Sequence, residues 1–294
     1  MKKRVSGSIF AYMFGLTILV SLIFLSIAIY HTWVPQQSDA LLELPASEEP
    51  VHIEEENVED TPSIPVIMER FVDLYEQNND LVGWIRVPNT VIDYPVVHCS
   101  DNEFYLKHDF EKRPSADGIP FLDMGAGILE KNQSLSIYGH YLKNGQMFTA
   151  LHNYKDLEYY KNYPLFEFHN IYENGFYKIF SVFYMAGNRT DGLFYYYPVS
   201  NFNSDAAFMQ HVNELLVRSI FITNVDVIPG DQLVLMTCCT YETDNLRLIV
   251  AGRKIRPGES FAVNTVNAQL NPEPLFPRKW YDTKGGTPPQ LSEH

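Results

Sequence analysis

A long apolar segment near the amino terminus sets the first constraint on this chain of 294 residues. No Asp, Glu, Lys or Arg occurs from Val5 to Val34, and Ile, Leu, Phe, Val and Ala dominate residues 9–30. Since a helix needs roughly 20 apolar residues to cross a bilayer, the segment is long enough to do so. Basic residues at positions 2–4 precede it and few follow, which predicts a cytoplasmic amino terminus. We therefore predict that residues 1–34 form a cytoplasmic start and a single transmembrane anchor, and that the rest of the chain is extracellular.

A cleaved signal peptide is the alternative reading of this segment, and it would also export the chain. The apolar run exceeds the roughly 7 to 15 residues of a signal-peptide core, and no convincing small-x-small cleavage site follows it. These two features favour an uncleaved anchor.

The next segment, residues 35–65, is acidic and rich in proline. The chain has a formal net charge of −14, which argues against nucleic-acid binding, and much of the negative charge lies in this segment. A segment with many carboxylates and few aromatic residues buries too little apolar area to fold. We predict a solvated stalk, with an acidic recognition segment as the alternative.

Residues 66–256 have the pattern of one β-rich domain. Apolar side chains at helical spacing predict a short amphipathic helix over residues 67–75, and Ser204 is placed to cap a second helix. Short runs of β-branched and aromatic residues between turn formers predict strands. Those runs are residues 81–88, 91–97, 133–138, 165–169, 175–185, 225–228, 232–238 and 246–254. Many short strands with few helices indicate a β-barrel or a β-sandwich.

The last segment, residues 257–294, is rich in Pro, Gly and Asn. We recognise no core in it and predict a flexible tail.

The cysteines are the first candidates for chemistry. There are three, and Cys238 and Cys239 are adjacent, which does not fit a disulfide framework in an exported chain and leaves at least one thiol free. A nucleophilic thiolate needs a base or a positive charge nearby. His140 follows one predicted strand, and Arg247 lies in the strand after the cysteines. Because each of these residues alone is more often structural than catalytic, spacing alone predicts only an exported β-rich domain with a candidate Cys-His site.

The motifs around these residues resemble those of class B sortases, a family of cysteine transpeptidases. Residues 138–148, Tyr-Gly-His-Tyr-Leu-Lys-Asn-Gly-Gln-Met-Phe, are similar to the family signature around the catalytic histidine. Residues 230–247 resemble the Thr-Leu-x-Thr-Cys strand, the turn after it and the catalytic arginine. The resemblance extends from about Met68 to Arg256. Further matching motifs lie at residues 84–90, 94–97, 101–106 and 121–123.

The resemblance implies a fold and a mechanism. The fold is mainly β, a sortase-type eight-stranded barrel with an amino-terminal helix and a helix inserted before the cysteine strand. Cys239 would attack the Thr carbonyl of a sorting motif to form a thioacyl enzyme, His140 would transfer protons, and Arg247 would stabilise the oxyanion. Thr237 and Tyr241 would contact the substrate. No metal or organic cofactor is needed for this chemistry.

The adjacent cysteines leave the nucleophile open between two alignments. An ungapped alignment over residues 230–247 selects Cys239, whereas keeping a Thr-Cys pair selects Cys238 and lengthens the following turn by one residue. We favour Cys239. Since neighbouring strand residues point to opposite faces, only one of the two thiols can face His140. Cys99, in an earlier turn, is expected to be structural, with reversible oxidation against the site thiol as the alternative.

The resemblance also implies partners at the Gram-positive cell surface. They are secreted proteins that carry a sorting motif, and a peptidoglycan precursor or cross-bridge amine as acceptor. Class B sortases resemble one another in favouring an Asn-Pro-x-Thr type of motif, but the motif for this chain is not readable from the sequence. The alternatives are a pilus-assembling sortase that uses a pilin lysine, disfavoured because a second apolar run is lacking, and an anchored, catalytically inactive binding module.

Overall fold

The computed structural model describes residues 65–128, 132–239 and 245–288, which belong to one compact unit, Ser63–His294. The predicted anchor and almost all of the predicted stalk fall in residues 1–64, outside the described residues. Within the described ranges, no helix is long and apolar enough to cross a membrane.

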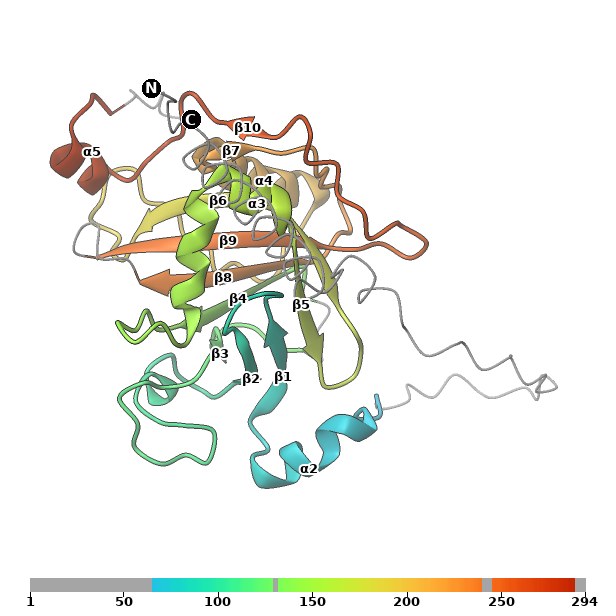
Figure 1. Ribbon diagram of the computed structural model, residues 1–294. Helices are drawn as coiled ribbons and strands as arrows, with labels where there is room; N and C mark the ends of the chain where they lie inside the picture. The colour runs from blue at the N-terminus through green and yellow to red at the C-terminus, as the bar shows by residue number, and fades with distance from the viewer. Residues whose placement is uncertain (1–64, 129–131, 240–244, 289–294) are drawn as a thin grey trace, which may run out of the picture. The chain divides into compact units, whose positions relative to one another are not determined.

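Eight strands close into a β-barrel in the order β1-β2-β3-β4-β8-β9-β6-β5 (Figure 1). Most neighbouring strands are antiparallel, but β2 and β3 pair in parallel, as do β4 and β8. The strands are β1 (Leu81–Arg86), β2 (Asp93–Val97), β3 (Phe121–Leu122), β4 (Ser134–Gly139), β5 (Leu165–Asn170), β6 (Phe176–Ala186), β8 (Leu233–Cys239) and β9 (Leu246–Lys254). The prediction of a mainly β, eight-stranded barrel is confirmed.

Strands β6, β8 and β9 are buried on both faces, which explains why their sequences are almost continuously apolar. Alternate side chains point to opposite faces of a strand. One set fills the barrel interior, and its fully buried members include Ile179, Val182, Val234, Met236, Leu248 and Val250. The other set packs under helix α4 (Asp205–Arg218), and it includes Phe180, Phe183, Leu233, Leu235, Ile249 and Ala251.

The two predicted helices are both present. Helix α2 (Glu69–Gln77) buries Phe71 against Leu81 at the start of β1. The side chain of Ser204 caps α4 by accepting a hydrogen bond from the backbone N–H of Ala207, at 3.2 Å. This bond satisfies one of the backbone donors that a helix start leaves without a partner.

Several short elements were not predicted, because two to eight residues leave little periodicity to detect. They are β7 (Phe221–Ile222), β10 (Gln269–Leu270), the 3₁₀ helices η1 (Phe104–Leu106) and η2 (Phe148–Lys155), and the helices α3 (Leu157–Asn162) and α5 (Arg278–Lys284). Strand β3 of the barrel was also missed.

The strand predicted over residues 225–228 was wrong. The backbone N–H of Ile228 donates to the carboxylate of Asp231 at 2.8 Å, and the N–H of Asp231 donates to the carbonyl of Ile228 at 3.1 Å. These bonds close a turn in place of a strand ladder. The segment contains apolar residues for another reason: Val225 and Val227 pack against the cluster under α4.

The flexible tail predicted after residue 256 also needs correction, since residues 257–288 pack on the barrel. Strand β10 pairs with β7, Ala268 is buried, and the stacked rings of Phe276 and Trp280 lie against the main core. The backbone N–H of Asn271 donates to the carbonyl of Ile220. A proline-rich composition does not prevent packing when aromatic side chains meet a core that other residues have already built.

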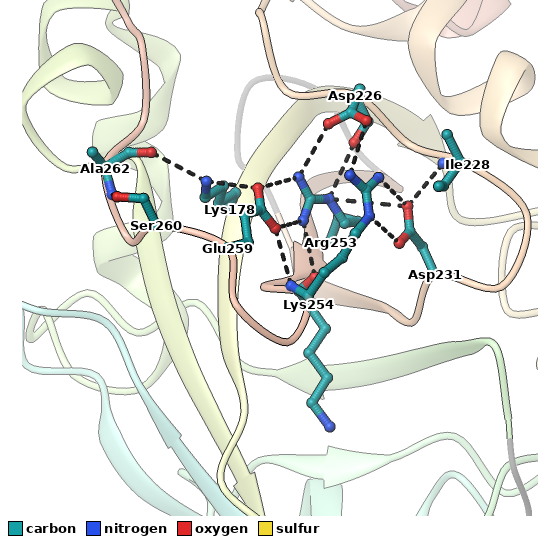
Figure 2. Close-up of polar contacts among 10 residues, drawn as sticks. Lys178, Asp226, Ile228, Asp231, Arg253, Lys254, Glu259, Ser260 and Ala262 are labelled. Atoms are coloured by element: carbon teal, nitrogen blue, oxygen red, sulfur yellow. Dashed lines mark hydrogen bonds and ion pairs between the residues drawn. The ribbon is translucent and has the colours of Figure 1, made fainter.

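A balanced group of charges holds the start of this segment to the barrel (Figure 2). The side chain of Arg253 on β9 is only 1% exposed and bonds to Glu259 at 2.9 Å and to Asp226 at 3.2 Å. Lys178 on β6 bonds to the same Glu259 at 2.7 Å, and Arg256 bonds to Asp231 at 2.8 Å. A buried cation is stable only when it is paired, so these contacts join the loop before β8, the barrel and the chain after β9.

Replacing Glu259 with glutamine should destabilise the fold by about 2 kcal/mol at pH 7, because the buried Arg253 guanidinium would lose its main carboxylate. We expect a smaller loss of stability than for a fully buried ion pair, because the Glu259 side chain keeps 24% of its surface exposed. Urea unfolding of the two chains measures the difference. The matched control is Glu173→Gln, whose carboxylate pairs with Lys254 but is 52% exposed, and it should change stability by less than about 0.5 kcal/mol.

The effect of Glu259 should depend on pH. The hydrogen bond from Arg253 holds the pKa of Glu259 far below its ordinary value of 4.5. A depressed folded-state pKa stabilises the fold above pH 4.5, and this stabilisation is lost as the pH falls further. The stability difference between wild type and Glu259→Gln should therefore narrow below pH 4.5. A constant difference from pH 7 to pH 3 would contradict this assignment.

Candidate active site

The end of β8 presents two thiols on opposite faces. Cys238 is fully buried in the barrel core, and burial raises the pKa of its thiol. Cys239 is exposed, and all three cysteines of the chain are free. Because a thiolate nucleophile must be reachable by its substrate, the exposed Cys239 suits this role and the fully buried Cys238 does not.

Cys239 opens into a hollow of about 150 Å³ at the rim of the barrel. The hollow is lined by Asn102, Leu106, Phe121, Tyr138, Gly139, His140, Thr237, Cys239 and Arg247. Four of the five predicted site residues thus lie around one space: Thr237 and Cys239 on β8, Arg247 on β9 and His140 directly after β4. The fifth, Tyr241, lies outside the described residues.

The strand pairing explains this meeting. Strands β4 and β8 are parallel, with Gly139 opposite Cys238, so both end at the same rim (Figure 1). Strand β9 runs antiparallel to β8, with Arg247 opposite Cys239, so its start lies where β8 ends. These pairings make three residues neighbours: His140, directly after β4; Cys239, the last residue of β8; and Arg247, the second residue of β9.

His140 is held by the carbonyl oxygen of Leu106, which lies 2.8 Å from the imidazole Nε2. A carbonyl oxygen only accepts hydrogen bonds, so Nε2 carries a proton in this arrangement. Nδ1 is then the ring nitrogen able to exchange a proton with a substrate. On another side the ring lies close to Gly118, where a Cβ would come within 3.1 Å of the imidazole carbon Cδ2.

The glycine of the Tyr-Gly-His motif has a packing reason. A Cβ at Gly139 would lie 2.5 Å from the ring of Phe148, which is fully buried. The backbone N–H of Phe148 also donates to the carbonyl of His140 at 3.0 Å. Contact between this glycine and this phenylalanine fixes the backbone on both sides of the imidazole.

Arg247 is half-buried beside two tyrosines. Its Nη1 donates to the hydroxyl of Tyr197 at 3.4 Å, and its Cζ lies 5.9 Å from the ring centroid of Tyr138. Burial alone would lower the pKa of Arg247, but the neighbouring Tyr197, Tyr138 and Cys239 raise it above its ordinary value. The guanidinium is therefore a fixed positive charge on the wall of the hollow.

The buried carboxylate of Asp123 connects two residues that line the hollow. The hydroxyl of Tyr138 donates to Asp123 at 2.9 Å, and the side-chain amide of Asn102 donates to the same carboxylate at 2.9 Å. Burial raises the pKa of Tyr138, so the phenol stays protonated as the donor. The sequence placed these residues in family motifs but gave no sign that Asp123 would connect two of the lining residues.

Thr237 supplies a polar group that lacks a partner. The residue is 2% exposed and lines the hollow, and among the described residues its Oγ1 has no hydrogen-bond partner. A buried hydroxyl without a partner costs roughly 1 to 3 kcal/mol. A ligand in the hollow that bonds to this hydroxyl would recover that cost.

Cys99 is not among the lining residues of the hollow. It is half-buried, its Sγ lies 3.2 Å from the carbonyl oxygen of Asp101, and burial raises the pKa of its thiol. It packs against the small cluster that contains Tyr105 and Phe121. The expected structural role stays a prediction.

Comparison with known proteins gives consistent relatives. Sortase B of Listeria monocytogenes is 29% identical over 185 residues, which cover 62% of this chain and 73% of the relative. Sortase B of Staphylococcus aureus is 27% identical over 189 residues, which cover 64% of this chain and 75% of the relative. The solved structure of a Staphylococcus aureus sortase B–substrate complex aligns with a TM-score of 0.59 and 26% identity, over 65% of this chain and 86% of that one. No family model matches the chain.

The fold and these relatives support placing the chain with the sortase-type transpeptidases. Within that class, the chain is a class B sortase-like protein.

Proposed function

We propose that the chain is a membrane-anchored cysteine transpeptidase that joins secreted proteins to an amine of the cell wall. The observation that carries the proposal is that Cys239, His140 and Arg247 line one hollow at the barrel rim. The donor substrate is a peptide with a sorting motif, and the bond that breaks follows a threonine. A sortase B structure from Staphylococcus aureus was solved as a substrate complex, which supports a substrate-binding role for this fold.

The first half-reaction forms a thioester at Cys239. The thiolate attacks the carbonyl carbon of the threonine, the C–N bond after that residue breaks, and the departing amine takes a proton from His140. In the second half-reaction, the acceptor amine attacks the thioester carbonyl and gives its proton to His140. The C–S bond breaks, and the enzyme returns to its starting state.

Arg247 stabilises the oxyanion of each tetrahedral intermediate and orients the peptide backbone. Its planar fork of donors is held by Tyr197 and by the face of Tyr138. Thr237 bonds to the bound peptide through the hydroxyl that has no partner among the described residues. Tyr241, just after the cysteine strand, is proposed as a second peptide contact on the basis of the family motif.

The acceptor is a peptidoglycan precursor or cross-bridge amine, and the domain acts outside the cell. The apolar residues 5–34 anchor the chain, which raises the effective concentration of substrates held at the same membrane surface. Labelling of Cys239 by a membrane-impermeant maleimide on intact cells tests this topology. Labelling only after lysis would refute it.

Mass spectrometry of the full chain tests the chemistry. The chain is incubated with a small panel of peptides that carry Asn-Pro-x-Thr or Leu-Pro-x-Thr-Gly motifs. We expect an adduct whose mass equals the chain plus the peptide up to its threonine. Addition of a small amine should release that fragment joined to the amine, and the adduct should disappear. A chain that binds these peptides but never forms an adduct would be a binding module and not a transpeptidase.

A further inference from the structure

His152 contacts the backbone of the proposed nucleophile. It lies on η2, and its imidazole Nε2 is 3.1 Å from the carbonyl oxygen of Cys239. Since the carbonyl can only accept, Nε2 carries the hydrogen of this bond. The β4–β8 ladder ends at Gly139 and Cys238, so Cys239 lies beyond it. Cys239 still pairs with Arg247 of β9, and the bond from His152 holds the β8 backbone on its other side, where the ladder with β4 has ended.

Helix η2 also contacts the backbone of His140, which is the proposed general acid and base. At the start of η2, the backbone N–H of Phe148 donates to the carbonyl of His140 at 3.0 Å, and its ring packs on Gly139. One turn later, the side chain of His152 donates to the carbonyl of Cys239. Helix η2 is thus bonded to the backbones of both reacting residues.

The imidazole of His152 is oriented by packing as well as by the hydrogen bond. The ring of Tyr141 meets it edge to face, with centroids 4.7 Å apart and an angle of 72° between the planes. Tyr141 follows His140 directly and pairs with Met147 across the intervening loop. The direction of the Nε2 donor is therefore set by residues that also shape the loop after His140.

We propose that His152 is a positioning residue, which sets the distance between the sulfur of Cys239 and the imidazole of His140 by bonding to the carbonyl of Cys239. This inference rests on the proposed function. A displacement of a reacting group by about 1 Å can cost roughly 100-fold in rate, so a single backbone bond at the nucleophile has a measurable effect.

The test uses variants that differ in whether a donor reaches this carbonyl. His152→Gln keeps an amide donor at nearly the same reach as Nε2, whereas His152→Asn is one methylene shorter and does not reach. His152→Phe keeps the ring that packs on Tyr141 but has no donor. Asn153→Ala, at the neighbouring exposed position on η2, is the matched control.

We expect the rate of adduct formation by the full chain with a sorting peptide to fall about tenfold in the Asn and Phe variants, with KM unchanged. The Gln variant should stay within about threefold of wild type, and Asn153→Ala should match wild type. Melting temperatures of all four variants identify any that fail to fold, and the Asn and Phe variants each substitute for the other in that case.

Three results would overturn the inference. Equal adduct rates in wild type and in the folded Asn or Phe variant would refute it and leave the proposed function intact. A defect confined to the later step with the amine would assign His152 to the acceptor instead of the thiol. Absence of any adduct in wild type would refute the proposed function, and this inference with it.

Discussion

Replacing Cys239 with alanine should reduce adduct formation at least roughly 10³-fold, whereas Cys238→Ala should keep a rate near that of wild type. The two residues are neighbours in sequence, but Cys239 opens into the hollow and Cys238 is fully buried in the core. A thiol whose pKa is raised by burial is a poor source of thiolate, so Cys238 cannot replace its neighbour. The measurement is the rate of appearance of the adduct mass.

The expected cost of the second variant is in stability and not in activity. Cys238→Ala removes a buried sulfur and should lower the free energy of unfolding by about 1 kcal/mol, because a small cavity is left in the core. Cys239→Ala changes an exposed side chain and should unfold like wild type. An adduct that survives Cys239→Ala and is lost in Cys238→Ala would assign the nucleophile to the other alignment.

Arg247→Lys should lower kcat/KM by roughly 10² to 10³-fold with the fold intact. Arginine offers a planar fork of donors, whereas lysine offers a compact ammonium on a flexible stem. The hydroxyl of Tyr197 and the ring of Tyr138 are placed for the wider, planar group. The kinetics should be measured together with circular dichroism, so that a loss of rate is not mistaken for a loss of fold.

The matched control for this change is Arg86→Lys on β1. Arg86 pairs with Glu167 across 3.6 Å, and its side chain is 52% exposed, so the same substitution there should leave kcat/KM unchanged. Transpeptidation by Arg247→Lys at the rate of the Arg86→Lys control would remove Arg247 from the mechanism.

The sequence predicted the strands that carry the site because each contains β-branched, aromatic or other apolar residues in a short run bounded by turn formers. Strands β4, β8 and β9 correspond to predicted runs, and the alternation of a strand explains why only one of two adjacent cysteines faces the hollow. The short strand β3 was missed, since two residues show no period. It pairs with both β2 and β4, and the chain before it supplies two lining residues of the hollow, Asn102 and Leu106.

This part of the hollow depends on contacts that sequence spacing does not show. Leu106 contributes a backbone carbonyl. Because every residue has a backbone carbonyl, the hydrogen bond between Leu106 and His140 could not be predicted from the sequence. The role of His152 was hidden for the same reason, because its partner is again a main-chain oxygen. The packing of the chain after residue 256 was not predicted. Composition indicates whether a segment can form its own core, but it does not show whether the segment can pack against another core.

The parallel pairing of β4 with β8 has a consequence for the order of folding. Strands β5 and β6 and helix α4 lie between these partners in the sequence, so their contacts are non-local. Non-local pairing is slow, because a long loop must close before any contact compensates for the lost entropy. Cys239 and Arg247 pair across the consecutive strands β8 and β9, so these two residues come together early, and only His140, which follows β4, joins them late.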